Sequence, residues 1–363
     1  MRITLVISSL QRGGAERVMS TMANYWIAQG HDVTLLTIDP LELDTFELHP
    51  GIKRLTLGLS GKSETAWQGF KNNIPRILSL RKVISELRPD VVISFMDRQN
   101  VMMVIATLGL HIPLIISERV DPRYEKINFY WNWARRLVYR FADALVIQAE
   151  SIRPWTRGII SADRVHVIPN PVHLQPIERN PEPDKIIVGM GRLVYQKGFD
   201  LLLNAFARCT QKYPDWRLVI LGEGPERDHL KRLILELNLK EKVELPGVTM
   251  NPVAVLQKAS LFVLSSRWEG FPNALLEAMA CGLPVISFDC PSGPSEIIRH
   301  EVDGLLVPLE KAEALTEAML LLMENEDKRN QLGVKAVEVH ERFALDKIMG
   351  QWEALCQQVI HKA

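Results

Sequence analysis

Residues 261–286 read LFVLSSRWEGFPNALLEAMACGLPVI and contain the signals that decide the fold. The apolar runs at the two ends of this stretch predict buried strands. Between them, Pro272 has the fixed φ that suits the first turn of a helix, and Gly282 suits its end. The stretch therefore predicts a strand, a loop with Glu269, a helix with Glu277, and a second strand.

The two carboxylates of this stretch suit a ligand that carries both phosphate and sugar. Residues eight apart on an ideal helix point about 80° apart, so Glu269 and Glu277 share a crevice only if Glu269 precedes the helix. The free amides of Asn273 to Leu275 and the helix dipole would hold a phosphate group there. Carboxylates accept hydrogen bonds from the hydroxyls of a sugar and a ribose. The stretch therefore predicts a nucleotide-sugar site.

The order of residues in this stretch resembles the donor motif of family 4 retaining glycosyltransferases. The resemblance lies in the run EGFPNALLEAMACGLPVI, which begins at Glu269. The alternative is that Glu277 is an ordinary exposed helical residue and that Glu269 caps a turn. The resemblance implies a catalytic role for Glu269, and a donor site made of Glu269, Gly270, Phe271, Pro272, Asn273, Ala274, Leu275 and Glu277.

Length and composition indicate the class of protein. At 363 residues the chain exceeds the usual size of one hydrophobic core, which predicts two domains. Hydrophobic residues make up 47% of the chain and charged residues 24%, as in soluble globular proteins. No apolar run is long enough to cross a membrane and no signal-peptide pattern is present, so we expect a cytoplasmic protein. The 4 cysteines form no close pair and no metal-ligand spacing with histidine, which predicts reduced thiols.

Short apolar runs alternate with helical patterns along both halves of the chain. This alternation predicts an α/β protein with two doubly wound, Rossmann-like domains, each a parallel sheet covered on both faces. The resemblance covers the whole chain and implies the GT-B fold, in which two such domains face each other across a cleft. We expect residues 1–174 to form the acceptor-binding domain, to which a C-terminal helix at 345–363 returns. Residues 175–344 then form the nucleotide-sugar-binding domain, after a polar, proline-rich linker at 175–184.

Three further segments carry residues that the resemblance assigns to the donor. A glycine pair precedes a predicted helix near the N-terminus, where it is either a close approach to the donor diphosphate or a tight turn. A Gly-Arg-Leu…Lys-Gly loop follows the first strand of the second domain, and in the family its Arg and Lys bind the diphosphate. A Gly-Val pair matches the position that holds the nucleotide base. In chain order these residues are Gly13, Gly14, Arg192, Lys197, Gly247 and Val248.

Arg119 departs from the family pattern. Many relatives carry a histidine at the end of this strand, where it touches the reacting sugar, whereas this chain reads Ser117-Glu118-Arg119. A guanidinium cannot act as a base at cellular pH, so we expect Arg119 to be a catalytic residue that contacts phosphate or an anionic acceptor. A donor phosphate oxygen then accepts the proton. We expect Glu118 to pair with Arg119 rather than to act as a nucleophile.

These residues predict a retaining, metal-independent hexosyltransferase. The chain has no Asp-x-Asp pair to hold a divalent ion on the diphosphate, so we expect no metal and no cofactor, with Arg192 and Lys197 as the catalytic cations. The donor is expected to be a UDP-sugar that carries hexose or N-acetylhexosamine. The acceptor is expected to be a glycan or a polyprenyl-diphosphate-linked oligosaccharide, because the chain resembles the bacterial enzymes that extend such acceptors.

Two alternatives to this activity remain open, a nucleotide-sugar epimerase of the same fold and a catalytically silent sugar-nucleotide-binding protein. We expect no nucleic-acid partner. The segment from Arg119 to Phe141 interleaves basic and aromatic side chains, which suits docking on the anionic inner face of the cytoplasmic membrane. The alternative is that Trp133, Leu137 and Phe141, which recur at helical spacing, face the sheet.

Overall fold

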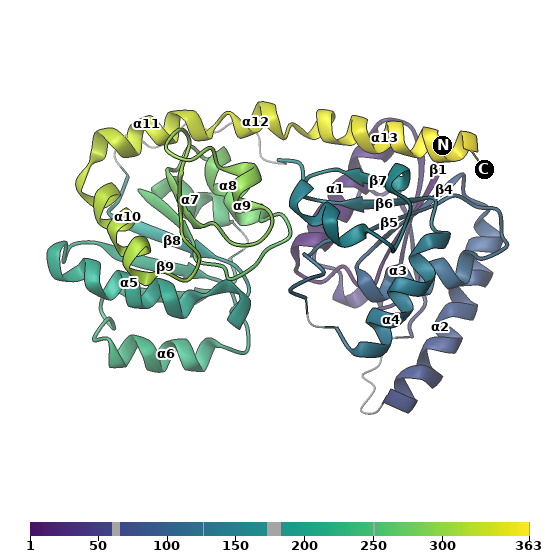
Figure 1. The fold of residues 1–363 in the computed structure, drawn as a ribbon, viewed down its shortest axis with the longest axis horizontal. Helices are drawn as coiled ribbons and strands as arrows, with labels where there is room; N and C mark the ends of the chain where they lie inside the picture. The colour runs from purple at the N-terminus through teal and green to yellow at the C-terminus, as the bar shows by residue number, and fades with distance from the viewer. Residues whose placement is uncertain (60–65, 126, 173–182, 250, 363) are drawn as a thin grey trace. The chain divides into compact units, whose positions relative to one another are not determined.

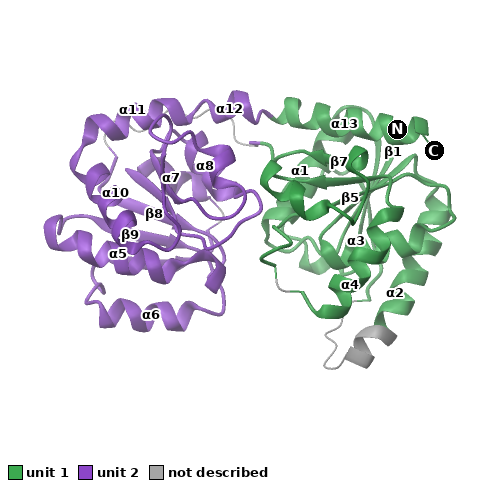
Figure 2. Cartoon of the chain, in the orientation of Figure 1, with its two compact units in different colours: residues 1–171, 345–363 green, residues 172–344 purple. Residues whose placement is uncertain are grey.

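The chain folds into two compact units, each built on one parallel sheet (Figures 1 and 2). Unit 1 comprises residues 1–171 and 345–363, and unit 2 comprises residues 172–344. The α/β class predicted from the alternating pattern is confirmed. Most of the linker predicted at 175–184 lies outside the described residues. The computed structural model describes residues 1–59, 66–125, 127–172, 183–249 and 251–362.

Unit 1 contains a parallel sheet of seven strands in the order β3-β2-β1-β4-β5-β6-β7. The central strand β1 pairs with β2 on one side and β4 on the other, so that Ile3 lies opposite both Val33 and Val91. The central strands are mostly apolar because both faces of the sheet are covered. The strands are β1 (Arg2–Ile7), β2 (Asp32–Thr37), β3 (Lys53–Thr56), β4 (Val91–Phe95), β5 (Leu114–Ser117), β6 (Ala144–Ile147) and β7 (Val165–Val167).

Helices cover both faces of this sheet and enclose two cores. One core joins the sheet to α1 and α13 through side chains such as Trp26 and Trp352. The other joins it to α2, α3 and α4 through side chains such as Leu80, Met103 and Val138. The helices are α1 (Gly14–Ala28), α2 (Ala66–Leu87), α3 (Asp97–Thr107), α4 (Phe129–Val138) and α13 (Leu345–Lys362), with short turns η1 (Leu41–Leu43), η2 (Tyr139–Phe141), η3 (Glu150–Thr156) and η4 (Ala162–Arg164).

Unit 2 repeats the plan with six parallel strands in the order β10-β9-β8-β11-β12-β13. Its central strand β8 pairs with β9 and β11. The strands are β8 (Ile186–Met190), β9 (Arg217–Leu221), β10 (Val243–Gly247), β11 (Leu261–Leu264), β12 (Val285–Phe288) and β13 (Leu305–Val307).

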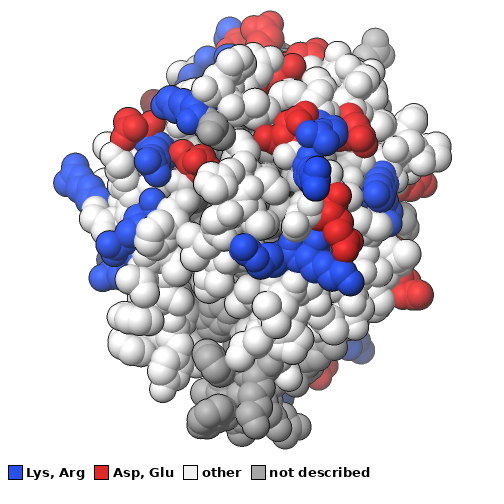
Figure 3. Space-filling view, turned by 90° about the vertical axis from the view of Figure 1, so that its right-hand side faces the viewer, with Lys and Arg blue, Asp and Glu red and all other residues white. Residues whose placement is uncertain are grey.

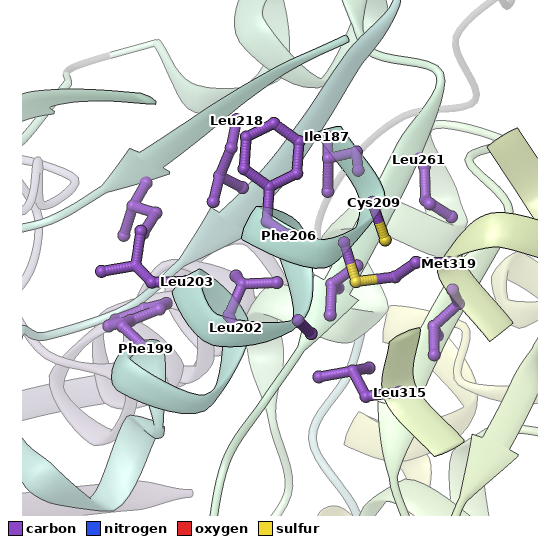
Figure 4. Close-up of a cluster of buried hydrophobic side chains, with 14 of the residues drawn as sticks. Ile187, Phe199, Leu202, Leu203, Phe206, Cys209, Leu218, Leu261, Leu315 and Met319 are labelled. Carbon is purple, nitrogen blue, oxygen red and sulfur yellow. The ribbon is translucent and has the colours of Figure 1, made fainter. Parts of the chain in front are cut away.

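The helices of unit 2 also lie on both faces of its sheet. One face packs on α5, α6 and α10, where Phe199, Phe206 and Met319 belong to the core shown in Figure 4. The other face packs mainly on α7, α8, α9 and α12. The helices are α5 (Phe199–Lys212), α6 (Arg227–Glu236), α7 (Pro252–Lys258), α8 (Asn273–Ala280), α9 (Pro294–Ile297), α10 (Ala312–Glu324), α11 (Glu326–Ala336) and α12 (Val339–Arg342), with the turn η5 (Tyr195–Lys197).

Both sheets reverse their strand order beside the first strand, between β1 and β4 in unit 1 and between β8 and β11 in unit 2. This confirms the predicted doubly wound topology. Ligands of such sheets bind beyond the carboxyl ends of the strands at this switch point. A ligand site in unit 2 is therefore expected at the loops that follow β8 and β11. In unit 1 it is expected at the loops that follow β1, β4 and β5.

Candidate active site

The loop after β8 carries Arg192 and Lys197 and lies directly against the loop after β11. The two loops meet at Gly198, which adopts a left-handed conformation with φ of 61°. A Cβ atom on Gly198 would lie 2.0 Å from the carbonyl oxygen of Ser265, so only glycine permits this approach. The switch point of unit 2 thus brings the predicted basic loop and the predicted carboxylate loop together.

Lys197 and Glu269 form an ion pair between these two loops. The Lys197 Nζ lies 2.5 Å from Glu269 Oε1, and the Ser266 hydroxyl donates to the same oxygen at 2.6 Å. The Glu269 side chain is only 7% exposed, and the Ser292 hydroxyl donates to its backbone carbonyl at 2.7 Å. The carboxylate is therefore fixed in position, as a group that orients a ligand should be.

Arg267 ties the same two loops together, a role that the sequence did not predict. Its guanidinium donates to both carboxylate oxygens of Asp200, at 2.9 and 2.7 Å, and its Nε donates to Glu310 at 2.8 Å. It also stacks on the Tyr195 ring, with Cζ 3.9 Å from the ring centroid. Asp200 and Glu310 lie far from Arg267 in sequence, so no local spacing signals this contact.

Helix α8 begins one residue later than the sequence predicted. Pro272 is the N-cap rather than a residue of the first turn, and Asn273 is the first helical residue. The amide of Leu275 donates to the Pro272 carbonyl at 3.1 Å, so the prediction that this amide is free is wrong. Glu277 lies within α8 and is buried, with 4% of its surface exposed.

The loop between β12 and α9 also packs against the donor motif, and this contact was not predicted from the sequence. Gly293 has φ of 95°, and a Cβ atom there would lie 2.9 Å from the Gly270 carbonyl oxygen. On the other side of the donor motif, the Phe271 ring packs edge-on against Phe343 with centroids 5.4 Å apart. The Pro-Ser-Gly-Pro run at residues 291–294 is a turn signal that could have indicated this loop.

Gly247 and Val248 lie at the end of β10, on the same edge of the sheet. Gly247 has φ of 89°, and its carbonyl accepts a hydrogen bond from the Gly222 amide at 2.8 Å. A Cβ atom on Gly247 would lie 2.8 Å from Glu223 Oε1. Val248 is exposed. This strand end therefore offers backbone groups and an exposed apolar side chain beside the basic loop.

In unit 1, Gly13 and Gly14 lie at the start of α1. Gly13 is the N-cap residue with an extended backbone, and Gly14 is the first residue of the helix. The carboxylate of Glu16 lies over Gly13, with Oε2 2.1 Å from the place of a Cβ atom. A negative charge there is favourable because the helix dipole is positive at its N-terminus.

Arg119 is buried at the carboxyl edge of the unit 1 sheet. Its guanidinium lies 4.2 Å from the centroid of the Phe95 ring, and its Nη2 donates to Asn170 Oδ1. Burial lowers the pKa of Arg119 to about 9, an effect that the negative charge of Glu16 partly opposes. The predicted pair with Glu118 does not form, so that prediction is wrong.

Glu118 pairs with Arg135 and Tyr139 instead of with Arg119. The Tyr139 hydroxyl donates to Glu118 Oε1 at 2.6 Å, and Arg135 Nη1 lies 3.3 Å from the same oxygen. Successive residues of an extended chain point to opposite sides, which explains why Glu118 and Arg119 diverge. Burial raises the pKa of Glu118 to about 7, although Arg135 opposes the shift.

The exposed face of α4 and η2 carries the large apolar residues that the alternative interpretation placed against the sheet. Trp133, Leu137 and Phe141 are 60%, 43% and 56% exposed, so that alternative is wrong. No helix among the described residues has the length and apolar character needed to span a membrane. Lys126, one of the predicted basic residues, lies outside the described residues. We call the exposed residues of this segment the α4 surface: Phe129, Tyr130, Trp133, Arg136, Leu137, Arg140 and Phe141.

Comparison with known proteins identifies the family. The model described as "Glycosyltransferase Family 4" matches residues 12–176, and "Glycosyl transferases group 1" matches residues 173–339. A Campylobacter jejuni N-acetylgalactosamine-N,N'-diacetylbacillosaminyl-diphospho-undecaprenol 4-alpha-N-acetylgalactosaminyltransferase is 31% identical, and the match covers 96% of this chain and 97% of that protein. The chain belongs to glycosyltransferase family 4.

Two further comparisons place this family 4 glycosyltransferase among its relatives. A second Campylobacter jejuni protein, which transfers N-acetyl-D-galactosamine to a GalNAc-containing diphospho-undecaprenol acceptor, is 29% identical over 99% of both chains. The crystal structure of Anabaena HepE in complex with UDP matches with a TM-score of 0.81 at 19% identity, covering 99% of this chain and 100% of that one. This structural match confirms the predicted GT-B fold class.

Proposed function

We propose that this family 4 enzyme is a retaining glycosyltransferase that moves a hexose or N-acetylhexosamine from a UDP-sugar to a lipid-linked or glycan hydroxyl. The observation that carries the proposal is the Lys197–Glu269 ion pair, fixed by Ser266 at the switch point of unit 2. The two Campylobacter relatives act on diphospho-undecaprenol-linked acceptors, and HepE binds UDP, which supports this choice of substrates.

Lys197 and Arg192 are proposed to stabilise the departing diphosphate. Negative charge accumulates on this group as the glycosidic bond breaks, and fixed cations lower the energy of that transition state. An ammonium has three N–H donors, and the bond from Lys197 to Glu269 uses one of them. With these two cations in place, we propose that the reaction needs no divalent metal.

The two carboxylates of the donor motif are proposed to hold hydroxyl groups. Glu269 accepts from the reacting sugar in this proposal, because the lysine and serine bind its Oε1 and no described residue donates a hydrogen bond to its second oxygen. Glu277 accepts from the ribose. Gly247 and Val248 are proposed to hold the base. The loop before α8 and its first turn, from Gly270 to Leu275, and the glycines Gly13 and Gly14 are proposed to contact the diphosphate and sugar.

Arg119 is proposed to contact a phosphate group, and a donor phosphate oxygen to accept the acceptor proton. The buried guanidinium cannot serve as a base, and Glu118 is held by Arg135 on the other side of the strand end. No observation favours the epimerase, since the curated relatives named above are transferases. A silent binding protein is equally disfavoured, because it would not need the fixed Lys197–Glu269 pair.

The α4 surface is proposed to dock on the anionic inner face of the cytoplasmic membrane. Aromatic side chains suit the headgroup level, and the exposed Arg136 and Arg140 suit anionic lipids. A nucleic-acid partner is not proposed, because basic and acidic side chains intermingle on the face shown in Figure 3 and the formal net charge is zero.

Binding of UDP followed by thermal unfolding tests the donor site. At a hundredfold excess over its dissociation constant, UDP should stabilise the folded protein by about 2.7 kcal/mol. Lys197→Ala should weaken this stabilisation and lower the rate of sugar transfer by about 10²–10³-fold, the usual effect of losing one transition-state donor. Lys185→Ala is the matched control, because Lys185 forms an exposed surface pair with Asp215. A wild-type protein that no nucleoside diphosphate stabilises would contradict the proposal.

A further inference from the structure

Three polar side chains meet where neighbouring strands of the unit 1 sheet end. Arg119 follows β5, Gln148 follows β6 and Asn170 follows β7, and all three are buried. Figure 1 shows these three strands side by side at one edge of the unit 1 sheet. The cluster is therefore assembled by the sheet itself rather than by a loop.

Arg119 is the charged member of this cluster. The side chains that hydrogen-bond to it are neutral, and the negative charge of Glu16 acts on it without forming an ion pair among the described residues. Arg119 Nη2 donates to Asn170 Oδ1, and its Nη1 lies 3.4 Å from the Ser117 hydroxyl. When the Gln148 amide is oriented so that both of its groups have partners, its oxygen accepts from Arg119 Nη2 at 3.2 Å and its nitrogen donates to the Arg119 carbonyl at 2.7 Å. Among the described residues, no carboxylate forms an ion pair with Arg119.

A neighbouring buried arginine shows how the charge of a buried cation is normally balanced. Arg135 is also buried, and it pairs with the Glu118 carboxylate at 3.3 Å. A buried cation without a counter-charge is unfavourable, which is why such groups are normally paired. Arg119 also retains unused donors: a guanidinium has five N–H groups, and the Nε of Arg119, like that of Arg135, has no partner among the described residues. What distinguishes Arg119 from Arg135 is the lack of a paired carboxylate among those residues.

We propose that Asn170 and Gln148 hold Arg119 as an anion site for a phosphate group of the substrate, and that their neutrality sets its affinity. Neutral amides fix the guanidinium in place without cancelling its charge. A planar guanidinium matches phosphate oxygens with two parallel hydrogen bonds, which an ammonium cannot do. Asn170 and Gln148 are positioning residues, and Arg119 is the group that contacts the ligand.

The choice of phosphate rests on the proposed function, in which both substrates carry a diphosphate. The donor provides one as a nucleoside diphosphate, and the lipid-linked acceptor provides the other as a prenyl diphosphate. The charge of Arg119 suits both sources equally. Binding measurements with inorganic pyrophosphate, UDP and geranyl diphosphate on the full chain separate them.

The decisive variant is Asn170→Asp, which changes one amide to a carboxylate of nearly the same shape. The new carboxylate would form an ion pair with Arg119 and neutralise its charge. The affinity for pyrophosphate should therefore fall by about tenfold or more. Asn170→Ala is the matched control, because it removes the same hydrogen bond without adding charge, and it should weaken binding less than Asn170→Asp. Gln148→Glu applies the same test from β6 if Asn170→Asp does not fold. Thermal unfolding and near-ultraviolet circular dichroism check that each variant is folded.

The three probes assign the source of the phosphate. Weaker binding of UDP to Asn170→Asp assigns the site to the donor, and weaker binding of geranyl diphosphate assigns it to the acceptor. Unchanged binding of all three probes, or a larger effect of Asn170→Ala than of Asn170→Asp, would overturn the inference. These outcomes differ from a failure of the proposed function, in which the wild-type protein itself would not bind UDP.

Discussion

At the scale of single residues, Arg267 makes the contacts that hold the loop after β11 against the loop after β8 and the start of α5. Arg267→Lys keeps the charge but loses the fork that bonds Asp200 twice and Glu310 once. We expect a loss of about 1–3 kcal/mol in the free energy of unfolding, and a fall in kcat on the order of 10–100-fold as Lys197 and Glu269 lose their alignment.

Urea unfolding and steady-state kinetics measure these two effects separately. Arg208→Lys is the matched control, because Arg208 forms an exposed pair with Glu313 that contributes little. Reduced stability with an unchanged kcat would show that Arg267 supports the fold without positioning the site.

The buried carboxyl of Glu118 should leave a signature in the pH dependence of stability. Burial raises its pKa from 4.5 to about 7, so the folded state binds a proton that the unfolded state releases between these pH values. The stability that this group contributes is therefore present below about pH 4.5 and is lost as the pH rises towards 7. Relative to Glu118→Gln, the wild-type protein should lose on the order of 3 kcal/mol across this window. Parallel pH profiles from urea unfolding of the two proteins would refute the assignment.

At the scale of elements, α4 offers a test of membrane docking. Each basic residue near an anionic surface contributes about 1 kcal/mol, so Arg136→Glu with Arg140→Glu should lower the free energy of vesicle binding by about 2 kcal/mol or more. Arg135 is left unchanged because it is buried and holds Glu118.

Sedimentation with vesicles of graded anionic-lipid content measures this change. A charge-matched control is Lys231→Glu with Arg232→Glu, which alters two exposed residues of α6 in unit 2. If the wild-type protein stays in the supernatant at low salt, or if both variants bind equally, the α4 surface is not the docking site.

The sequence predicted the positions of the helices and strands better than it predicted which side of each helix is buried. The strands followed from apolar runs, and the glycine that separates α8 from β12 stood where the turn required it. Helical spacing alone cannot say which side of α4 and η2 is buried, because the polar side chains of Arg135 and Tyr139 face the core, where both contact Glu118. In the same way, the contacts of Arg267 with Asp200 and Glu310 join residues that are far apart in the sequence, so no local sequence pattern predicts them.

At the scale of the whole molecule, the proposed chemistry uses two protein cations in place of a metal ion. Dialysis against EDTA should therefore leave the transfer rate unchanged, because Arg192 and Lys197 remain in place. The check is the rate before and after chelation, with added magnesium as the comparison. Complete loss of transfer that magnesium restores would show that a divalent ion holds the diphosphate.

The discontinuous make-up of unit 1 has a consequence for biogenesis. Helix α13 supplies Ile348, Trp352 and Val359 to the core that contains Trp26, although residues 172–344 of unit 2 separate these segments along the chain. A ribosome releases the whole of unit 2 before it releases α13. We therefore expect unit 2 to reach its native fold first, while the part of one sheet face that α13 covers stays exposed and depends on chaperones. Limited proteolysis of arrested nascent chains would reveal this order, with unit 2 protected before unit 1.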